Sequence, residues 1–179
     1  MQEVILTSSF TSPNPLQAIE AEQSVLGAVF LDNSILDTLT MMLETRDFSI
    51  GKHQILWKAI TYLYHSGKSI DLVTIAEMLK RYDRYEEIGG IQYISQLVQA
   101  VPSAANAPYY AEIVRSKAYR RRAMEAGERI RNLAMEGDFE NDEDFFTEVE
   151  SVAASVRPGI NSEMKHIRDA RKEFFNYLN

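Results

Sequence analysis

Apolar residues recur every three or four positions along most of this chain, the spacing of α-helices that bury one face. Up to residue 100 the pattern predicts five helices, the first beginning near Pro15 and the others covering residues 35–43, 53–64, 71–79 and 91–100. No segment alternates apolar and polar residues in the manner of a half-buried strand. The sequence therefore predicts an all-α fold that opens with a small globular helical bundle.

Residues with capping or helix-breaking character mark the ends of these helices. Asn14 can cap the first helix, with Gln17 as its capping-box partner, and Asp71 can cap the fourth. The pair Gly89-Gly90 indicates a turn with positive φ. Pro102 ends the fifth helix, because proline disfavours helical backbone at the residue before it.

A much longer helix is predicted over residues 107–136, with Asn106 as its N-cap and Pro108 in its first turn. At 1.5 Å per residue it would be about 45 Å long, too long to be buried in so small a bundle. Its apolar stripe changes face near the middle, and the second half has the spacing of a heptad seam. The members of this predicted seam are Tyr119, Ala123, Ala126, Ile130 and Leu133.

A second apolar seam follows at once, on a helix expected to start near Asn141. Its members are Phe145, Val149, Val152 and Val156. Since the connection is short, the two helices should be antiparallel neighbours, and residues 104–156 are predicted to form a helical hairpin. The first arm is rich in Arg and the second in Asp and Glu. Exposed ion pairs contribute only about 0–1 kcal/mol each, so the seams should hold the hairpin and the charges should mainly set its pairing.

Two other features of the hairpin allow two interpretations each. The cluster Arg120–Arg122 could contact phosphates, or it could be a solvated helix face opposite the acidic arm. The acidic residues that follow favour the second interpretation. Met135 and Phe146 lie off the seam, so they are either intermolecular contacts or scattered apolar residues on solvated helices.

The remaining segments complete the predicted domain organisation. Residues 1–14 are expected to be a flexible tail, residues 15–103 the globular head, residues 104–156 the hairpin, and residues 157–179 a linker that ends in an amphipathic helix. That helix either folds back on the head or docks on a receptor outside this chain, and its uncovered stripe favours docking. The stripe consists of Ile167, Ala170, Phe174, Tyr177 and Leu178.

Composition and motifs give no sign of an active site. The chain has 179 residues, a net charge of −7 and no cysteine, which argues against a freestanding nonspecific nucleic-acid binder and against thiolate chemistry. It contains no P-loop and no G-x-G-x-x-G motif. His53, His65 and His166 lack the spacing of a metal site, and Glu20 and Glu22 point in different directions on one helix. We therefore predict no catalytic, cofactor or metal site, no enzymatic activity of this chain alone, and no membrane segment.

Taken together, four short motifs resemble the N-terminal domain of DnaB-type hexameric replicative DNA helicases. They follow the order of that family and extend, with the segments between and after them, over about residues 15–179. The motifs are Ala18–Gly27, Ile70–Thr74, Gly89-Gly90 with Tyr93, and Pro102–Asn106 with Tyr110. The segment Tyr82–Tyr85 and the N-terminal tail depart from the family pattern, which fits a divergent member of the family, one that a bacteriophage could encode.

The resemblance implies a role for each part of the chain. It implies a collar in which heads pair with heads and hairpins with hairpins, so that dimers form a hexameric ring that binds the C-terminal domain of primase or a helicase loader. It also implies that the linker helix docks on the ATPase domain of the neighbouring subunit. ATP, Mg²⁺ and single-stranded DNA would be bound by the assembled parent helicase, in the bacterial cytosol.

A helix-turn-helix regulator is the alternative from another functional class. Residues 53–64, the turn at Gly67 and residues 71–79 have the outline of such a domain. A recognition helix, however, is rich in Arg, Lys, Asn or Gln, and residues 71–79 offer Asp71, Thr74 and Glu77 instead. Trp57 lies on an apolar helical stripe, so we expect it in the core rather than stacked on a base. The alternative therefore ranks second.

Overall fold

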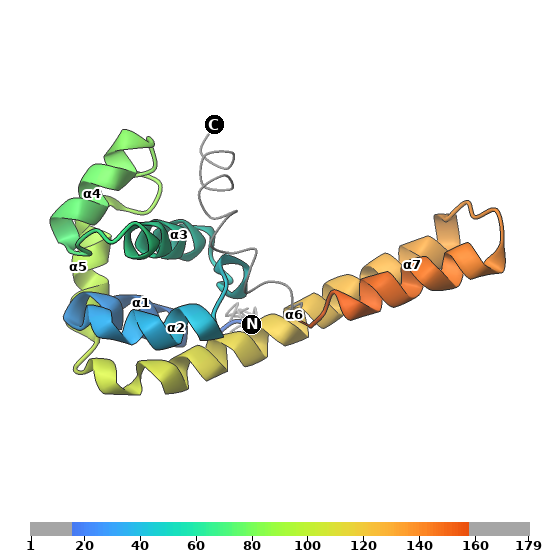
Figure 1. Ribbon diagram of the computed structural model, residues 1–179, viewed down its shortest axis with the longest axis horizontal. Coiled ribbons are helices and arrows are strands. Elements are labelled where there is room, and N and C mark those ends of the chain that lie inside the picture. Colours follow the sequence, from blue (N-terminus) through green and yellow to red (C-terminus); the bar gives the residue numbers. More distant parts are fainter. Residues whose placement is uncertain (1–15, 158–179) are drawn as a thin grey trace, which may run out of the picture.

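The computed structural model describes residues 16–157, which form a helical head and a protruding helical hairpin (Figure 1). The head contains α1 (Ile19–Leu31), α2 (Leu36–Met42), α3 (Gly51–His65), α4 (Leu72–Arg81) and α5 (Gly90–Ala100). The hairpin consists of α6 (Ala107–Glu136) and α7 (Asp142–Ala154). Three 3₁₀ turns lie between these helices: η1 (Asn33–Ile35), η2 (Thr45–Asp47) and η3 (Ala104–Asn106). The predicted all-α fold is confirmed, whereas the tail over 1–14 and the linker-helix stripe lie outside the described residues.

The core of the head lies between α1, α2, α3, α4, α5 and the first half of α6. Trp57 is buried there, as predicted, with its ring 5.3 Å from that of Phe48 between centroids. Leu26 on α1 and Ile60 on α3 are likewise fully buried. Burying one side chain of this size contributes about 1.5–3 kcal/mol, so this cluster is the main source of the head's stability.

The 30 residues of α6 serve both parts of the molecule. Its first half packs along α1 and α2, and its second half leaves the head and is paired by α7 running back toward it (Figure 1). The fully buried positions of α6 are Ala107, Ala111, Val114, Ala118 and Ala126. Tyr119, Ile130 and Leu133 of the predicted second stripe are half-buried. At 3.6 residues per turn they lie roughly a quarter turn round the helix from the stripe that faces the head. Arg122 lies on the same side of α6, one turn from Ala118 and one turn from Ala126.

The helix boundaries agree with the sequence at some sites and differ at others. Asp71 caps α4, accepting hydrogen bonds from the backbone N–H groups of Val73 and Thr74 at 2.9 Å. By contrast, α1 begins at Ile19 and not near Pro15, so the predicted capping box with Gln17 is wrong. The carbonyl oxygen of Leu16 accepts a hydrogen bond from Arg121 on α6, which holds the chain before α1 in place through a tertiary contact.

The entrance to α6 also differs in detail from the prediction. The Asn106 side chain makes no capping hydrogen bond, although Pro108 does lie in the first turn of the helix. The chain enters α6 through η3, where the Ser103 hydroxyl accepts a hydrogen bond from the N–H of Ala105 at 3.2 Å. The N–H of Ala107, at the start of α6, donates to the carbonyl oxygen of Ala104 in η3, so the 3₁₀ turn satisfies a donor at the helix entrance.

The turn before α5 explains the aromatic segment Tyr82–Tyr85. Gly89 and Gly90 have φ values of +88° and +61°, as their pairing predicts. A Cβ atom on Gly90 would lie 3.2 Å from the ring of Tyr85, so this glycine lets the ring pack on the backbone. The Tyr85 hydroxyl then accepts a hydrogen bond from the N–H of Ile91 at 3.0 Å. The tyrosine therefore satisfies one of the free donors at the start of α5.

Candidate functional site at the junction of head and hairpin

Two arginines of α6 fasten the hairpin to the head. Arg121 donates hydrogen bonds to the carbonyl oxygens of Leu16, at 2.8 Å, and of Asp47. Arg122 forms an ion pair with the carboxylate of Asp47, and their side chains are only 10% and 3% exposed. The expectation that the cluster Arg120–Arg122 faces the acidic arm is therefore wrong for Arg121 and Arg122. The buried stripe of α6 continues through these two positions and turns them toward η2.

Asp47 holds this junction from the side of the head. Its carboxylate also accepts a hydrogen bond from the N–H of Glu44 at 2.7 Å, which closes a capping box within η2. Burial raises the pKa of Asp47, and the Glu44 N–H and the Arg122 guanidinium oppose that rise without cancelling it. Burial therefore destabilises the ionised carboxylate by more than its hydrogen bond and ion pair stabilise it, as is common for buried ion pairs.

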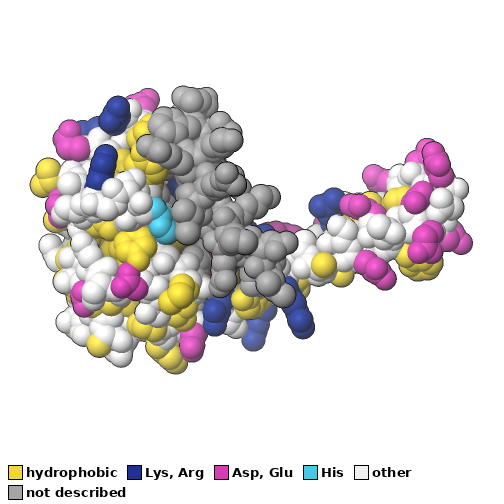
Figure 2. Space-filling view, viewed as in Figure 1, with side chains coloured by type: hydrophobic (Ala, Val, Ile, Leu, Met, Phe, Trp, Pro, Cys, Tyr) yellow, Lys and Arg dark blue, Asp and Glu magenta, His cyan; other side chains and the backbone are white. Residues whose placement is uncertain are grey.

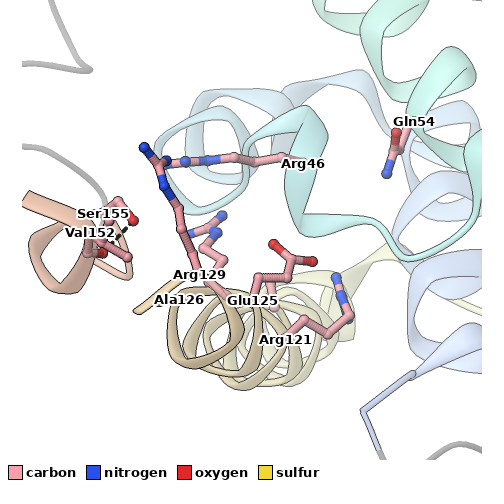
Figure 3. Close-up of a pocket in the computed structure, with 10 residues that line it drawn as sticks. Arg46, Gln54, Arg121, Glu125, Ala126, Arg129, Val152 and Ser155 are labelled. Carbon is pink, nitrogen blue, oxygen red and sulfur yellow. Dashed lines mark hydrogen bonds between the residues drawn. The ribbon is translucent and has the colours of Figure 1, made fainter. Parts of the chain in front are cut away.

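A hollow of about 480 Å³ lies beside this junction, between η2, α6 and α7. Figure 3 shows Arg46 reaching into it from η2, Arg121, Glu125 and Arg129 from α6, and Val152 and Ser155 from α7. Ala118, Ala126 and Val152 supply its apolar surface. Gln54 of α3 also lines the hollow, so residues from four elements meet in one concave site that contains four arginines and one glutamate.

The predicted seam residues lie at different depths in the hairpin. Ala126 and Val152 are buried and Ala123 is exposed. Half-buried positions are Tyr119, Ile130, Leu133, Phe145, Val149 and Val156. The structure thus places Ala123 outside the contact, because Arg122 takes the neighbouring place on the buried stripe. Across the two arms, Arg129 pairs with Glu148 at 2.9 Å.

The tip of the hairpin combines acidic and aromatic side chains. Figure 2 shows acidic side chains gathered at the tip and basic ones where the hairpin leaves the head. The ring of Phe145 lies 5.3 Å from that of Phe139 and 5.6 Å from that of Phe146, between centroids. Met135 and Phe146 are 79% and 57% exposed, respectively. These two residues are therefore available for contact with another molecule.

A buried polar cluster in the head escaped the sequence analysis. The carboxylate of Glu22 on α1 lies 2.7 Å from Nδ1 of His53 on α3, and Nε2 of His53 lies 2.6 Å from the hydroxyl of Tyr93 on α5. Glu22 and His53 are 1% and 0% exposed. The second Glu22 oxygen accepts hydrogen bonds from the backbone N–H and the hydroxyl of Ser49, at 2.7 and 2.6 Å.

This cluster ties three helices together and fixes the orientation of the Tyr93 ring. The ammonium of Lys52 lies 3.5 Å from the centroid of that ring, a cation–π contact at the edge of the cluster. One signal in the sequence could have pointed to His53: together with Leu56, Trp57 and Ile60 it continues the apolar stripe of α3. A histidine on such a stripe needs polar partners, and nothing local in the sequence names Glu22 or Tyr93 as those partners.

Within residues 16–157, no group of three or more His, Asp or Glu side chains is arranged to hold a metal ion. In the same part of the chain, no helix has the length and apolar character needed to cross a bilayer.

Comparison with known families connects this architecture to DNA replication. The family model described as "DnaB-like helicase N terminal domain" matches residues 14–116, which span the head and the first part of α6. The chain belongs to this family.

Curated relatives of this DnaB-family domain are replicative helicases. It is 41% identical over 138 residues to the replicative DNA helicase DnaB of Geobacillus stearothermophilus, an alignment that covers 77% of the chain and 30% of the relative. It is 39% identical over 167 residues to the replicative DNA helicase DnaC of Bacillus subtilis, an alignment that covers 92% of the chain and 36% of the relative. The chain thus spans about a third of the length of these relatives.

Solved structures agree with this family assignment. The N-terminal domain of DnaB helicase from Mycobacterium tuberculosis superposes with a TM-score of 0.75 and 36% identity, covering 79% of this chain and 99% of that domain. A DnaB-like replicative helicase, described together with its interactions with primase, gives a TM-score of 0.64 at 21% identity. That match covers 83% of this chain and 34% of the helicase. The second likeness concerns the fold alone. The family match favours the helicase interpretation over the helix-turn-helix regulator.

Proposed function

We propose that this DnaB-family domain is the collar of a replicative DNA helicase, where subunits associate and where primase or a helicase loader binds. The observation that carries the proposal is the 36% identity to an N-terminal domain of DnaB that the chain matches over 99% of its length. The family match and the head-plus-hairpin architecture support it. Unwinding at the replication fork, with ATP and Mg²⁺ in an ATPase domain and single-stranded DNA in the assembled ring, is proposed for the complete helicase.

Self-association should use the hairpin. Met135 and Phe146 are exposed near its tip, where apolar side chains are costly unless a partner covers them. We expect a concentration-dependent increase in mass in sedimentation experiments, reduced in the double variant Met135→Ser, Phe146→Ser. Met41 on α2 of the head is also exposed, so Met41→Ser is a matched control for loss of surface apolarity. Equal masses for the wild type, the double variant and Met41→Ser would argue against hairpin pairing.

The partner proposal is tested by titrating the chain with the C-terminal domain of the cognate primase in a calorimeter. Saturable heat is the expected result, since a DnaB-like helicase of the same fold is described with its primase interactions. Binding to duplex DNA in place of primase would instead support the regulator. Absence of binding to primase, repeated with the complete hexameric helicase, would remove primase from the proposal.

Other parts of the proposal concern segments and context beyond residues 16–157. The stripe Ile167, Ala170, Phe174, Tyr177 and Leu178 is proposed to dock on the ATPase domain of the neighbouring subunit. A bacterial cytosolic location is proposed because the relatives are replicative helicases of bacteria, and a bacteriophage-encoded origin stays a prediction. Docking is tested by Phe174→Asp in the complete helicase, which should weaken hexamer formation, with Asn176→Asp as the control on the same segment.

A further inference from the structure

The hairpin is attached to the head through few contacts. Within residues 16–157, α7 packs extensively against α6 alone, so the returning arm does not hold the hairpin to the head. A hollow of about 480 Å³ lies between α7, α6 and η2 (Figure 3). The head therefore holds the second half of α6 mainly through η2, to which Arg121 and Arg122 are bound.

The ion pair at this attachment carries uncompensated costs. The side chains of Arg122 and Asp47 are only 10% and 3% exposed, and the Nε atom of Arg122 is buried without a hydrogen-bond partner. Burial also raises the pKa of Asp47, although its partners oppose that rise. Buried donors without acceptors and buried charges are both unfavourable. Both side chains would therefore regain hydration if the pair separated.

A second acidic partner for the two arginines lies on α6 itself. Glu125 follows Arg122 by three positions and Arg121 by four, the spacings at which side chains of one helix meet. It is exposed, lines the hollow, and forms no hydrogen bond or ion pair with another described residue. Figure 3 shows it reaching into the hollow beside Arg121. Its carboxylate is thus available to either arginine.

We propose that the junction is a latch with two states, in which Arg122 pairs either with Asp47 of the head or with Glu125 of its own helix. In the closed state, the pair with Asp47 fixes α6 to η2. In the open state, Glu125 receives Arg122 and also Arg121, whose acceptors in the closed state are uncharged backbone oxygens. The hairpin is then tied to the head by the continuous helix alone.

The latch controls where the exposed tip of the hairpin is presented to another molecule. The hollow leaves space on one side of α6 into which the hairpin can turn once the latch is open. Exposed ion pairs on a helix are weak, so the pair with Glu125 does not displace the pair with Asp47 in the wild type. Loss of the Asp47 charge should shift the latch to its open state.

The direction of the hairpin is measured as a distance between two spin labels by double electron–electron resonance. The chain has no cysteine, so the labels attach only to Met41→Cys on α2 and Glu140→Cys at the hairpin tip, both exposed positions. An excess of unlabelled chain suppresses distances between copies. We expect one distance in the otherwise wild-type chain and a second, displaced by several ångströms, in Asp47→Asn. This substitution removes the charge but keeps an acceptor for the N–H of Glu44.

A matched pair of second substitutions tests the exchange of partners. Glu125→Gln in the Asp47→Asn background removes the alternative carboxylate, so the second distance should lose its narrow distribution. Glu128→Gln in the same background is the control, because Glu128 is exposed on the same helix and pairs with Arg131 outside the hollow. The control should leave the second distance unchanged.

Two results would overturn the proposal. One is a single distance shared by the wild type, Asp47→Asn and Arg122→Gln, since the ion pair would then not determine the direction of the hairpin. The other is an identical distribution for the Glu125→Gln and Glu128→Gln double variants, which would remove Glu125 as the alternative partner. Circular dichroism shows whether each variant keeps its helices. Arg122→Gln opens the latch from the hairpin side, so it decides the question if Asp47→Asn does not fold.

Discussion

Arg122 on α6 and Asp47 on η2 form an ion pair that is almost completely withdrawn from solvent and joins the hairpin to the head. The rest of the junction depends on the same region, because Arg121 donates to the backbone carbonyl oxygen of Asp47. Any motion of the hairpin relative to the head would have to separate these groups. The pair thus fixes α6 to η2 at the point where the helix leaves the head.

Breaking this pair from one side should be costly. Asp47→Ala leaves the buried Arg122 guanidinium without its anionic partner, and such changes typically cost about 3–5 kcal/mol. Urea denaturation followed by circular dichroism gives the free energy of unfolding. Glu128→Ala, which removes the exposed partner of Arg131, should change it by less than about 1 kcal/mol. Similar losses in both variants would contradict a special role for the junction.

The same carboxylate should give the stability a characteristic dependence on pH. Because burial raises the pKa of Asp47, the folded protein holds that proton more tightly than the unfolded chain. The stability of the wild type relative to Asp47→Asn should therefore fall as the pH rises from about 4, the ordinary value for Asp. Denaturation curves of both proteins across this window measure the difference. A relative stability that rises with pH would mean that the ion pair outweighs the burial of the carboxylate.

Tyr93→Phe should destabilise the head by about 1–3 kcal/mol. The change removes the hydroxyl 2.6 Å from Nε2 of His53 and leaves that buried nitrogen without its partner. Tyr109→Phe is a suitable control, because Tyr109 is exposed at the start of α6. Thermal unfolding of both variants tests the role of the cluster. Equal melting temperatures would show that His53 finds another partner at little cost.

Two glycines in helices should respond in opposite ways to the same substitution. A Cβ atom on Gly27 of α1 would lie 2.2 Å from the carbonyl oxygen of Leu97 on α5, so Gly27→Ala should force the two helices apart and destabilise the head. Gly127 on α6 has open space around it. Gly127→Ala should therefore stabilise the hairpin by about 0.5–1 kcal/mol. Differential scanning calorimetry gives the sign of each change.

The hairpin contact can be tested at two neighbouring positions of the predicted seam. Ile130→Asp places a charge in the half-buried contact of α6 with α7 and should destabilise the hairpin by about 1–3 kcal/mol and abolish its pairing with another copy. Ala123→Asp should have little effect, since Ala123 is exposed. Sedimentation and thermal unfolding measure the two consequences. An unchanged mass and melting temperature for Ile130→Asp would contradict the seam.

The sequence by itself determined the helices and much of their arrangement. The bounds predicted for α6 agree with the structure, because a long amphipathic run and Gly137 after it are local features. The same holds for the cap at Asp71 and the glycine turn before α5. The antiparallel hairpin followed from the short connection, which leaves two adjacent helices few other ways to bury their apolar stripes.

Only the tertiary structure decided which polar groups meet. Glu22 and His53 are 31 positions apart, His53 and Tyr93 are 40 apart, and Arg122 and Asp47 are 75 apart. Helical periodicity shows which side of a helix faces inward, but not which side chain of another helix lies opposite. For that reason Arg121 and Arg122 looked like part of a solvated face, and Ala123 looked like a seam residue. Once the head is packed, an unpaired buried charge is costly, so Arg122 and Asp47 pair although they lie far apart in the sequence.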